Sequence, residues 1–292
     1  MKFYKIALAL AAGVCLFASC SSEADDIVEN IDNNVKVKKV LGVGTPTSVS
    51  RSSIANLDLS GHTTQDVHWA EGDKLSVFAE GHEKGDEFTW ASWPSSSLHN
   101  QANFEGYTYE GVSAYYILYP AQDNARLLST PEGPRLKFNI PRVQHAVDGS
   151  FDPAAGIQAI KASSIDTPTN LLNACSYFYI TLEPGYSKVE IEVPDNTTWH
   201  LAGTVTADVH TGGVTIKGFE PDCSNSIDLV GTEAGGTYFI AFIPTSGFKN
   251  KLQLTLHKEA GVESYEFEKA TDGLTFSVAT YYDLGSYPKV AQ

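Results

Sequence analysis

The sequence predicts an all-β protein built from two β-sandwich domains, and three observations carry that prediction. At about 150 residues per domain, a chain of 292 residues divides into two. Its 14 Tyr, 14 Phe, 24 Gly and 13 Pro favour pleated strands and tight turns. Short apolar runs recur between turn signals, whereas clear amphipathic helices are absent. This spacing of short strands is typical of a sandwich.

The charge balance limits the partners that the chain can have. Asp and Glu number 35 against 20 Lys and Arg, and the net charge of −15 repels phosphate backbones. We therefore expect no nucleic-acid partner and no basic membrane-surface patch. An apolar content of 42% excludes an intrinsically disordered chain.

The N-terminus predicts export and a lipid anchor. Residues 1–19 form a signal peptide, because two lysines precede an apolar run (6–18) that is too short to cross a bilayer, which takes about 20 residues. The run ends in LFASC (16–20), which resembles a bacterial lipobox, although Phe17 departs from the usual aliphatic residue. We expect Cys20 to become the acylated first residue and to anchor the protein to a membrane. Ordinary secretory cleavage, with Cys20 as a plain thiol, is the alternative.

The next residues, 20–34, form a short acidic tether. Acidic residues just after the lipidated Cys, beginning at Glu23, resemble the surface-export signal of Bacteroidetes lipoproteins, which implies the outer face of the outer membrane. The alternative is a solvated linker. Further along the chain, Cys175 and Cys223 could pair in an oxidising compartment or remain free thiols.

The first strand of the predicted sheet is Val35 to Val40, where apolar and charged residues alternate as in a half-buried strand. A polar stretch, Ser163 to Asn170, then divides the chain into halves of similar strand number, so we expect domains at 35–165 and 166–292. Further strands are predicted at 74–79, 87–90, 102–109, 114–119, 136–140, 157–162, 177–182, 188–193, 203–210, 213–217, 238–243, 252–257, 264–268 and 274–278.

One segment carries a family likeness. Residues 69–78 read WAEGDKLSVF and resemble the Trp-x-x-Gly-Asp-then-strand signature of the fimbrillin (Mfa-like) family, the pilins of Bacteroidales type V pili. Segments similar to the family's other motifs follow in its order at 114–120, 140–144, 151–153, 201–206 and 279–284. The resemblance therefore covers roughly residues 35–285.

The resemblance implies two transthyretin-like (Greek-key) β-sandwich domains in tandem, in a lipoprotein of the outer membrane that joins a surface fimbrium. In the family, a trypsin-like protease removes the first strand, and a strand from a neighbouring subunit fills the groove by strand addition. The partners would be other fimbrillin subunits and a host or bacterial surface glycan or protein. Only seven residues follow Gly285, and they include Pro288, so a tip or accessory role is favoured over the shaft.

Arg51 is the predicted protease site, because it lies in a Ser-rich segment between the first strand and the signature. Lys38 and Lys39, inside the first strand, are alternatives, and Arg51 could also be an ordinary surface arginine. The signature residues read as scaffold. Gly72 can supply a positive φ before the strand, Asp73 can bond local backbone amides, and Trp69 can cover the end of the sheet.

Motifs of known chemistry are absent, so we expect no enzyme, cofactor or metal site. The segment His82–Glu87 reads as a charged hairpin loop, and 222–228 reads as a turn rather than a calcium loop. The alternative function is a monomeric surface lipoprotein that binds glycans. Its candidate contacts are Trp90 and Trp93, whose flat rings could stack on sugars or could belong to the core or a lid.

Overall fold

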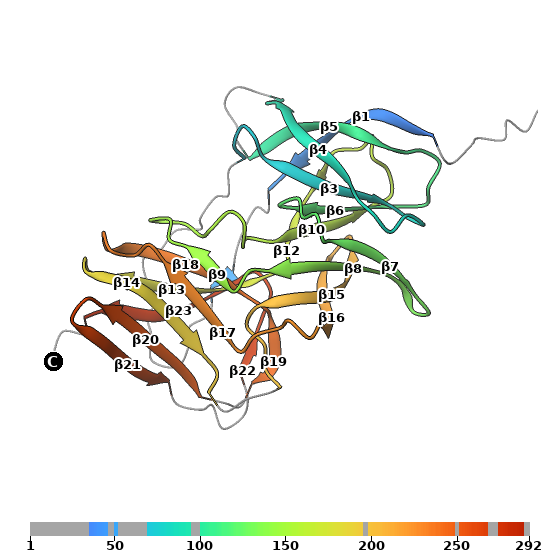
Figure 1. The fold of residues 1–292 in the computed structure, drawn as a ribbon. Coiled ribbons are helices and arrows are strands. Elements are labelled where there is room, and N and C mark those ends of the chain that lie inside the picture. Colours follow the sequence, from blue (N-terminus) through green and yellow to red (C-terminus); the bar gives the residue numbers. More distant parts are fainter. Residues whose placement is uncertain are drawn as a thin grey trace, which may run out of the picture. The chain divides into compact units, whose positions relative to one another are not determined.

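The computed structural model describes residues 35–45, 50–51, 69–94, 100–194, 198–248, 251–267 and 274–288. In these ranges the regular structure consists of β-strands, β1 to β23, without a helix, which confirms the all-β prediction (Figure 1). All described residues belong to one compact unit, 33–292. The strands form five sheets, which we call A to E.

Sheet A has eight strands and contains the first strand of the chain. In spatial order they are β11 (Thr169–Asn170), β1 (Lys36–Gly44), β5 (Gln101–Tyr109), β4 (Asp86–Ser92), β3 (Lys74–Ala79), β6 (Tyr115–Tyr119), β10 (Gln158–Ala162) and β12 (Leu172–Asn173). The short segment 169–173 pairs with β1 through β11 and with β10 through β12. This segment therefore closes the sheet on itself.

The concave face of sheet A buries what we call the inner cluster. Alternation along β1, β3, β5 and β6 places every second side chain on this face, as a pleated strand requires. The cluster consists of Leu41, Val43, Trp69, Leu75, Val77, Ala79, Phe88, Ala102, Phe104, Tyr115, Ile117, Tyr119, Ile160, Ala162, Ile165 and Leu171.

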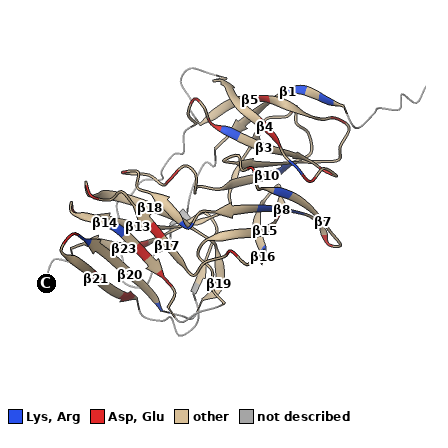
Figure 2. Ribbon diagram, viewed as in Figure 1, with Lys and Arg blue, Asp and Glu red and all other residues tan. Residues whose placement is uncertain are grey.

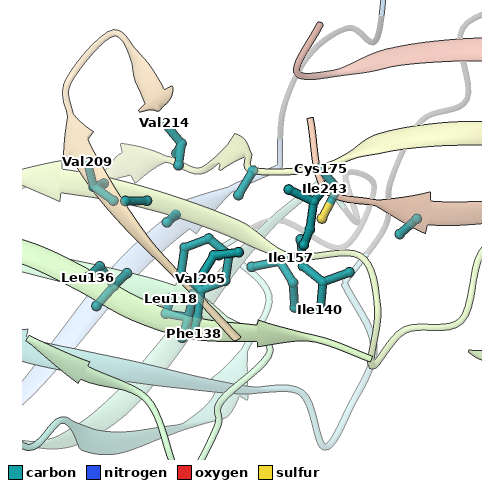
Figure 3. Close-up of a cluster of buried hydrophobic side chains, with 14 of the residues drawn as sticks. Leu118, Leu136, Phe138, Ile140, Ile157, Cys175, Val205, Val209, Val214 and Ile243 are labelled. Carbon is teal, nitrogen blue, oxygen red and sulfur yellow. The ribbon is translucent and has the colours of Figure 1, made fainter. Parts of the chain in front are cut away.

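Sheet C covers part of the opposite face of sheet A. Its strands, in order, are β16 (Gly213–Phe219), β15 (Gly203–His210), β8 (Gly133–Ile140) and β7 (Arg126–Thr130). Leu118 of β6 packs with Phe138 of β8 and Val205 of β15 in the largest buried cluster (Figure 3). Because β3, β6 and β10 are covered on both faces, their residues are buried at nearly every position.

Sheets B and D enclose a second core. The strands of sheet B, in spatial order, are β18 (Gly236–Phe242), β13 (Ser176–Leu182), β23 (Thr280–Tyr287) and β2 (Ser50–Arg51). Those of sheet D are β21 (Gly261–Phe267), β20 (Leu252–Lys258), β14 (Tyr186–Glu192), β17 (Ser226–Val230) and β9 (Val143–His145). Sheet E is the pair β19 (Thr245–Phe248) and β22 (Leu274–Phe276). At the centre, the rings of Phe178 and Phe242 stack 3.9 Å apart.

Strand pairing crosses residue 165. From the first half of the chain, β8 pairs with β15 and β9 pairs with β17. The Gln144 side chain also donates to the Ala241 carbonyl at 2.6 Å and accepts from the Ala241 amide at 2.9 Å. The division into domains at residue 165 and the tandem transthyretin-like arrangement stay predictions. A boundary at residue 165 would separate β8 from its partner β15 and β9 from its partner β17.

Some strands lie where the sequence analysis expected none. The segment 222–228, interpreted as a turn, ends in the start of β17, and β23 is an inner strand of sheet B. By contrast, β20 buries alternate residues, as its strict alternation predicts. The expected central strand at 177–182 is β13, which is buried on both faces.

Candidate functional site

The candidate site is the first strand, β1, together with the position that it occupies in sheet A, which we call the β1 groove. β1 pairs with β5 over nine residues in antiparallel register, from Lys36 opposite Tyr109 to Gly44 opposite Gln101. Its last two residues also pair in parallel with β11. One strand near the start of the described chain is thus an integral part of the closed sheet (Figure 1).

The second half of β1, residues 41–44, is buried. Leu41 and Val43 are 0% and 1% exposed and belong to the inner cluster. Backbone hydrogen bonds hold the end of the strand, since the Leu171 amide donates to the Gly44 carbonyl at 3.0 Å and the Thr45 amide donates to the Asn100 carbonyl at 2.9 Å. Burial and main-chain bonding together fix this half of β1.

The first half of β1, residues 36–40, carries three lysines and alternates between exposed and partly buried positions. Its lysines face acids on neighbouring elements: Lys36 pairs with Asp86, Lys38 with Glu105 at 2.9 Å, and Lys39 with Glu110 and with Asp166, the last at 3.1 Å. Figure 2 shows basic positions on β1 and acidic positions on β4 and β5.

These ion pairs change the titration of the lysines. The pKa of each is raised, mainly by the hydrogen bond to the facing carboxylate, which is that of Asp86 for Lys36, Glu105 for Lys38 and Glu110 for Lys39. The ion pairs therefore favour the protonated, charged form of each lysine.

Trp69 connects the family signature to β1. Its indole N–H donates to the Val43 carbonyl at 3.0 Å, and its ring meets Phe104 and Tyr119 edge to face at 5.0 and 4.9 Å. From the sequence, Trp69 is predicted only to cover the end of the sheet. The structure shows that the ring also holds the β1 backbone.

Gly72 and Asp73 form the turn that positions Trp69. Gly72 has a φ of 94°, a conformation that costs glycine little. The Asp73 carboxylate accepts from the Ala70 amide at 2.7 Å and from the Tyr119 hydroxyl at 3.0 Å. Burial and the Asp73 charge raise the pKa of Tyr119, so this hydroxyl stays a donor at ordinary pH.

Arg51, the predicted protease site, lies in β2, and its side chain is outside the described residues. The backbone of β2 pairs in parallel with β23, with Ser50 opposite Thr280 and Arg51 opposite Tyr281. The chain therefore passes from sheet A to sheet B between residues 44 and 50. The alternatives Lys38 and Lys39 lie inside β1, paired on the backbone with Tyr107 and Gly106.

The two candidate glycan contacts pack on the inner cluster. Trp90 and Trp93 are partly buried, and their rings meet edge to face at 5.4 Å. The Trp90 indole N–H is buried without a hydrogen-bond partner. A role of this pair in glycan binding stays a prediction.

Among the described residues, the remaining sequence candidates do not come together in a site. Cys20 lies outside the described residues, whereas Cys175 and Cys223 are free thiols whose pKa values burial raises to about 12 and about 11. Within the described ranges, no three His, Cys, Asp or Glu residues gather as a metal site would require. No helix among the described residues is long and apolar enough to span a membrane.

The acids that face β1 were missed by the sequence analysis. Asp86, Glu105, Glu110 and Asp166 come from segments up to 80 residues apart, and no local pattern marks them as partners of β1. The only signal was the alternation of lysines in the first strand, which becomes informative once the register with β5 is known.

Comparisons with known proteins give similarity in structure alone. No protein-family model matches the chain, and no curated protein matches it. A candidate cell adhesion protein from Bacteroides uniformis covers 86% of this chain and 93% of its own at 13% identity and a TM-score of 0.48. One from Bacteroides fragilis covers 88% and 95% at 14% identity and 0.40. A fimbrial protein from Bacteroides ovatus covers 88% of this chain and 52% of its own at 12% identity and 0.32.

Proposed function

We propose that this chain is a non-enzymatic fimbrial subunit or tip or accessory adhesin of the cell surface. It is exported as a lipoprotein through Cys20 and assembled by strand exchange at the β1 groove. The resemblance of residues 69–78 to the fimbrillin signature supports the family, and the geometry of β1 supports the mechanism. Other subunits of the same kind are the partners, and the lipid anchor joins the protein to the outer membrane.

The observation that carries this proposal is the position of β1. The strand is joined to the rest of sheet A by pairing along one side with β5, by a short contact with β11 and by two buried side chains. Its removal would expose the inner cluster and a row of unpaired β5 backbone groups, a surface that another strand can pair with. A strand from another subunit could then take the empty position of β1 in sheet A.

A cut at Arg51 would convert β1 from a covalent part of the chain to a bound segment. Because Cys20 precedes β1 in sequence, release of this segment would also separate the body from its anchor. Among the described residues, β2 pairs with β23 over Ser50 and Arg51. Lys39 is a poorer site, since its side chain is held by two acids and is 16% exposed.

The test is limited digestion of the mature lipoprotein with a trypsin-like protease, with and without shaft subunits. Mass spectrometry reads the new N-terminus, and native electrophoresis reads the oligomeric state. The proposal predicts one cut after Arg51 followed by assembly. The Arg51→Gln variant, the matched control, should resist the cut and remain unassembled. No discrete cut, or a cut product that stays an inert monomer with shaft partners present, contradicts the proposal.

The alternative, a monomeric glycan-binding lipoprotein, rests on the partly buried pair Trp90 and Trp93. Replacing both with Ala should abolish retention on a glycan array under this alternative and leave assembly intact under the main proposal. Glycan retention by the unmodified chain, lost in that variant and accompanied by no assembly, would favour the alternative.

A further inference from the structure

We propose that the β1 groove selects its incoming strand by charge. The strand that it accepts carries cations at the positions of Lys36, Lys38 and Lys39, followed by apolar side chains at those of Leu41 and Val43. This inference rests on the proposed function, because it defines the chemistry of the strand exchanged there. The partner is thus an extended segment that is basic at one end and apolar at the other.

An acidic rim surrounds the charged half of the groove. It consists of Asp86 on β4, Glu105 on β5, Glu110 after β5 and Asp166 between β10 and β11. Among the described residues, the lysines of β1 are the only cations that form ion pairs with these acids. Loss of β1 would therefore leave Asp86 and Glu105 on one side of the groove, and Glu110 and Asp166 on the side of Lys39, without their lysine partners, and an incoming strand would have to supply cations to both.

Asp86 makes the strictest demand of the four. Its side chain is only 12% exposed, and its Oδ2 atom is buried without a hydrogen-bond partner. The ammonium of Lys36 is the cation paired with this carboxylate, and it also lies 4.9 Å from the centre of the Tyr109 ring. A neutral or acidic residue here would leave a largely desolvated carboxylate unpaired, which costs far more than the loss of a surface ion pair.

The apolar half of the groove cannot supply this selectivity. Leu41 and Val43 enter a pocket of buried aliphatic and aromatic side chains, and such a pocket accepts most alternating apolar strands. The backbone bonds to β5 are formed by any extended segment. Apolar contacts and main-chain bonds thus supply affinity, whereas repulsion of acidic strands by the rim supplies specificity.

The test uses the full mature chain cut after Arg51 and three fluorescent peptides. One has the sequence of residues 35–45, one has Arg at the three lysine positions, and one has Glu there. Fluorescence anisotropy measures binding of each peptide to the cut protein. We expect the Lys and Arg peptides to bind within about threefold of each other and the Glu peptide to bind at least about 100-fold more weakly. Raising the ionic strength from about 0.05 to about 0.5 M should narrow that gap.

A rim variant provides the matched control. In the cut protein with Asp86→Asn, Glu105→Gln, Glu110→Gln and Asp166→Asn, the difference between the Lys and Glu peptides should fall to about threefold. Circular dichroism checks that this variant is folded. If it is not, a variant with only Glu105→Gln and Glu110→Gln, at more exposed positions, takes its place and should partly reduce the difference in affinity between the Lys and Glu peptides.

The possible failures are distinguishable. Equal binding of the Lys and Glu peptides to the cut protein overturns charge selection and leaves strand exchange standing. Binding of no peptide, the one of residues 35–45 included, overturns both proposals, because the groove then does not open. Charge-selective binding without assembly in the presence of shaft subunits supports the inference and contradicts the fimbrial role.

Discussion

The two halves of β1 hold the same strand in place by different physics. In residues 41–44, two fully buried side chains and a hydrogen bond from Trp69 attach the strand to the inner cluster. In residues 36–40, Val40 is 55% exposed, and attachment comes from ion pairs with the acidic rim. Burial makes the attachment of the apolar half stable. Because the charged half is more exposed, its attachment is weaker, but it depends on the charge of the residues that face it.

The largest expected effect comes from emptying the apolar half. Leu41→Ala removes a fully buried side chain from the inner cluster and should lower the free energy of unfolding by about 2–5 kcal/mol. Val40→Ala, at the adjacent exposed position, should change it by less than about 0.5 kcal/mol. Urea unfolding of both variants measures the difference. Equal losses would mean that the two halves of β1 do not differ in the way described.

A smaller effect should come from the hydrogen bond that Trp69 makes to the Val43 carbonyl. Trp69→Phe keeps an aromatic ring but leaves this carbonyl without its indole donor, and should cost about 1–3 kcal/mol beyond the loss of ring volume.

Trp90→Phe is the matched control for that substitution. It makes the same change of ring at a residue whose indole N–H is buried without a partner, so it should cost less than Trp69→Phe. Urea unfolding of both variants gives the comparison. If the two cost the same, the bond to Val43 contributes nothing measurable to the attachment of β1.

The smallest effect concerns the charged half and depends on pH. Folding raises the pKa of Lys36, Lys38 and Lys39 through their carboxylate partners. Their contribution to stability is therefore complete below the unfolded value of about 10.4 and is lost as the pH rises through the higher folded values.

Melting temperatures of the unmodified chain and of a variant with Met at Lys38 and Lys39, whose acidic partners are more exposed than Asp86, measure this contribution for those two lysines. The unmodified chain should melt slightly higher at pH 8, and the difference should shrink above about pH 10.4. The Leu41→Ala variant should show no such narrowing against the unmodified chain. A difference that persists undiminished in strongly alkaline solution would exclude the ion pairs as its cause.

Local sequence determined where many of the strands lie and which of their faces are buried. The alternation in 252–257 appears as the alternating burial of β20, and the continuous apolar run in 177–182 appears as the doubly covered β13. Gly72 was identifiable as the residue for a turn with positive φ. Such features are local, because side-chain periodicity reports directly on the environment of one strand.

The tertiary structure alone decided which strands pair, and with that it decided the site. Closure of sheet A by residues 169–173, the pairing of β8 and β9 with strands of the second half, and the register of β1 on β5 join residues far apart in sequence. The acidic rim exists only because that register brings Asp86, Glu105 and Asp166 to the lysines of β1. Pairing is selected by the burial of whole faces across the sheet, since a shift of one residue in register would turn every side chain of a strand to its other face.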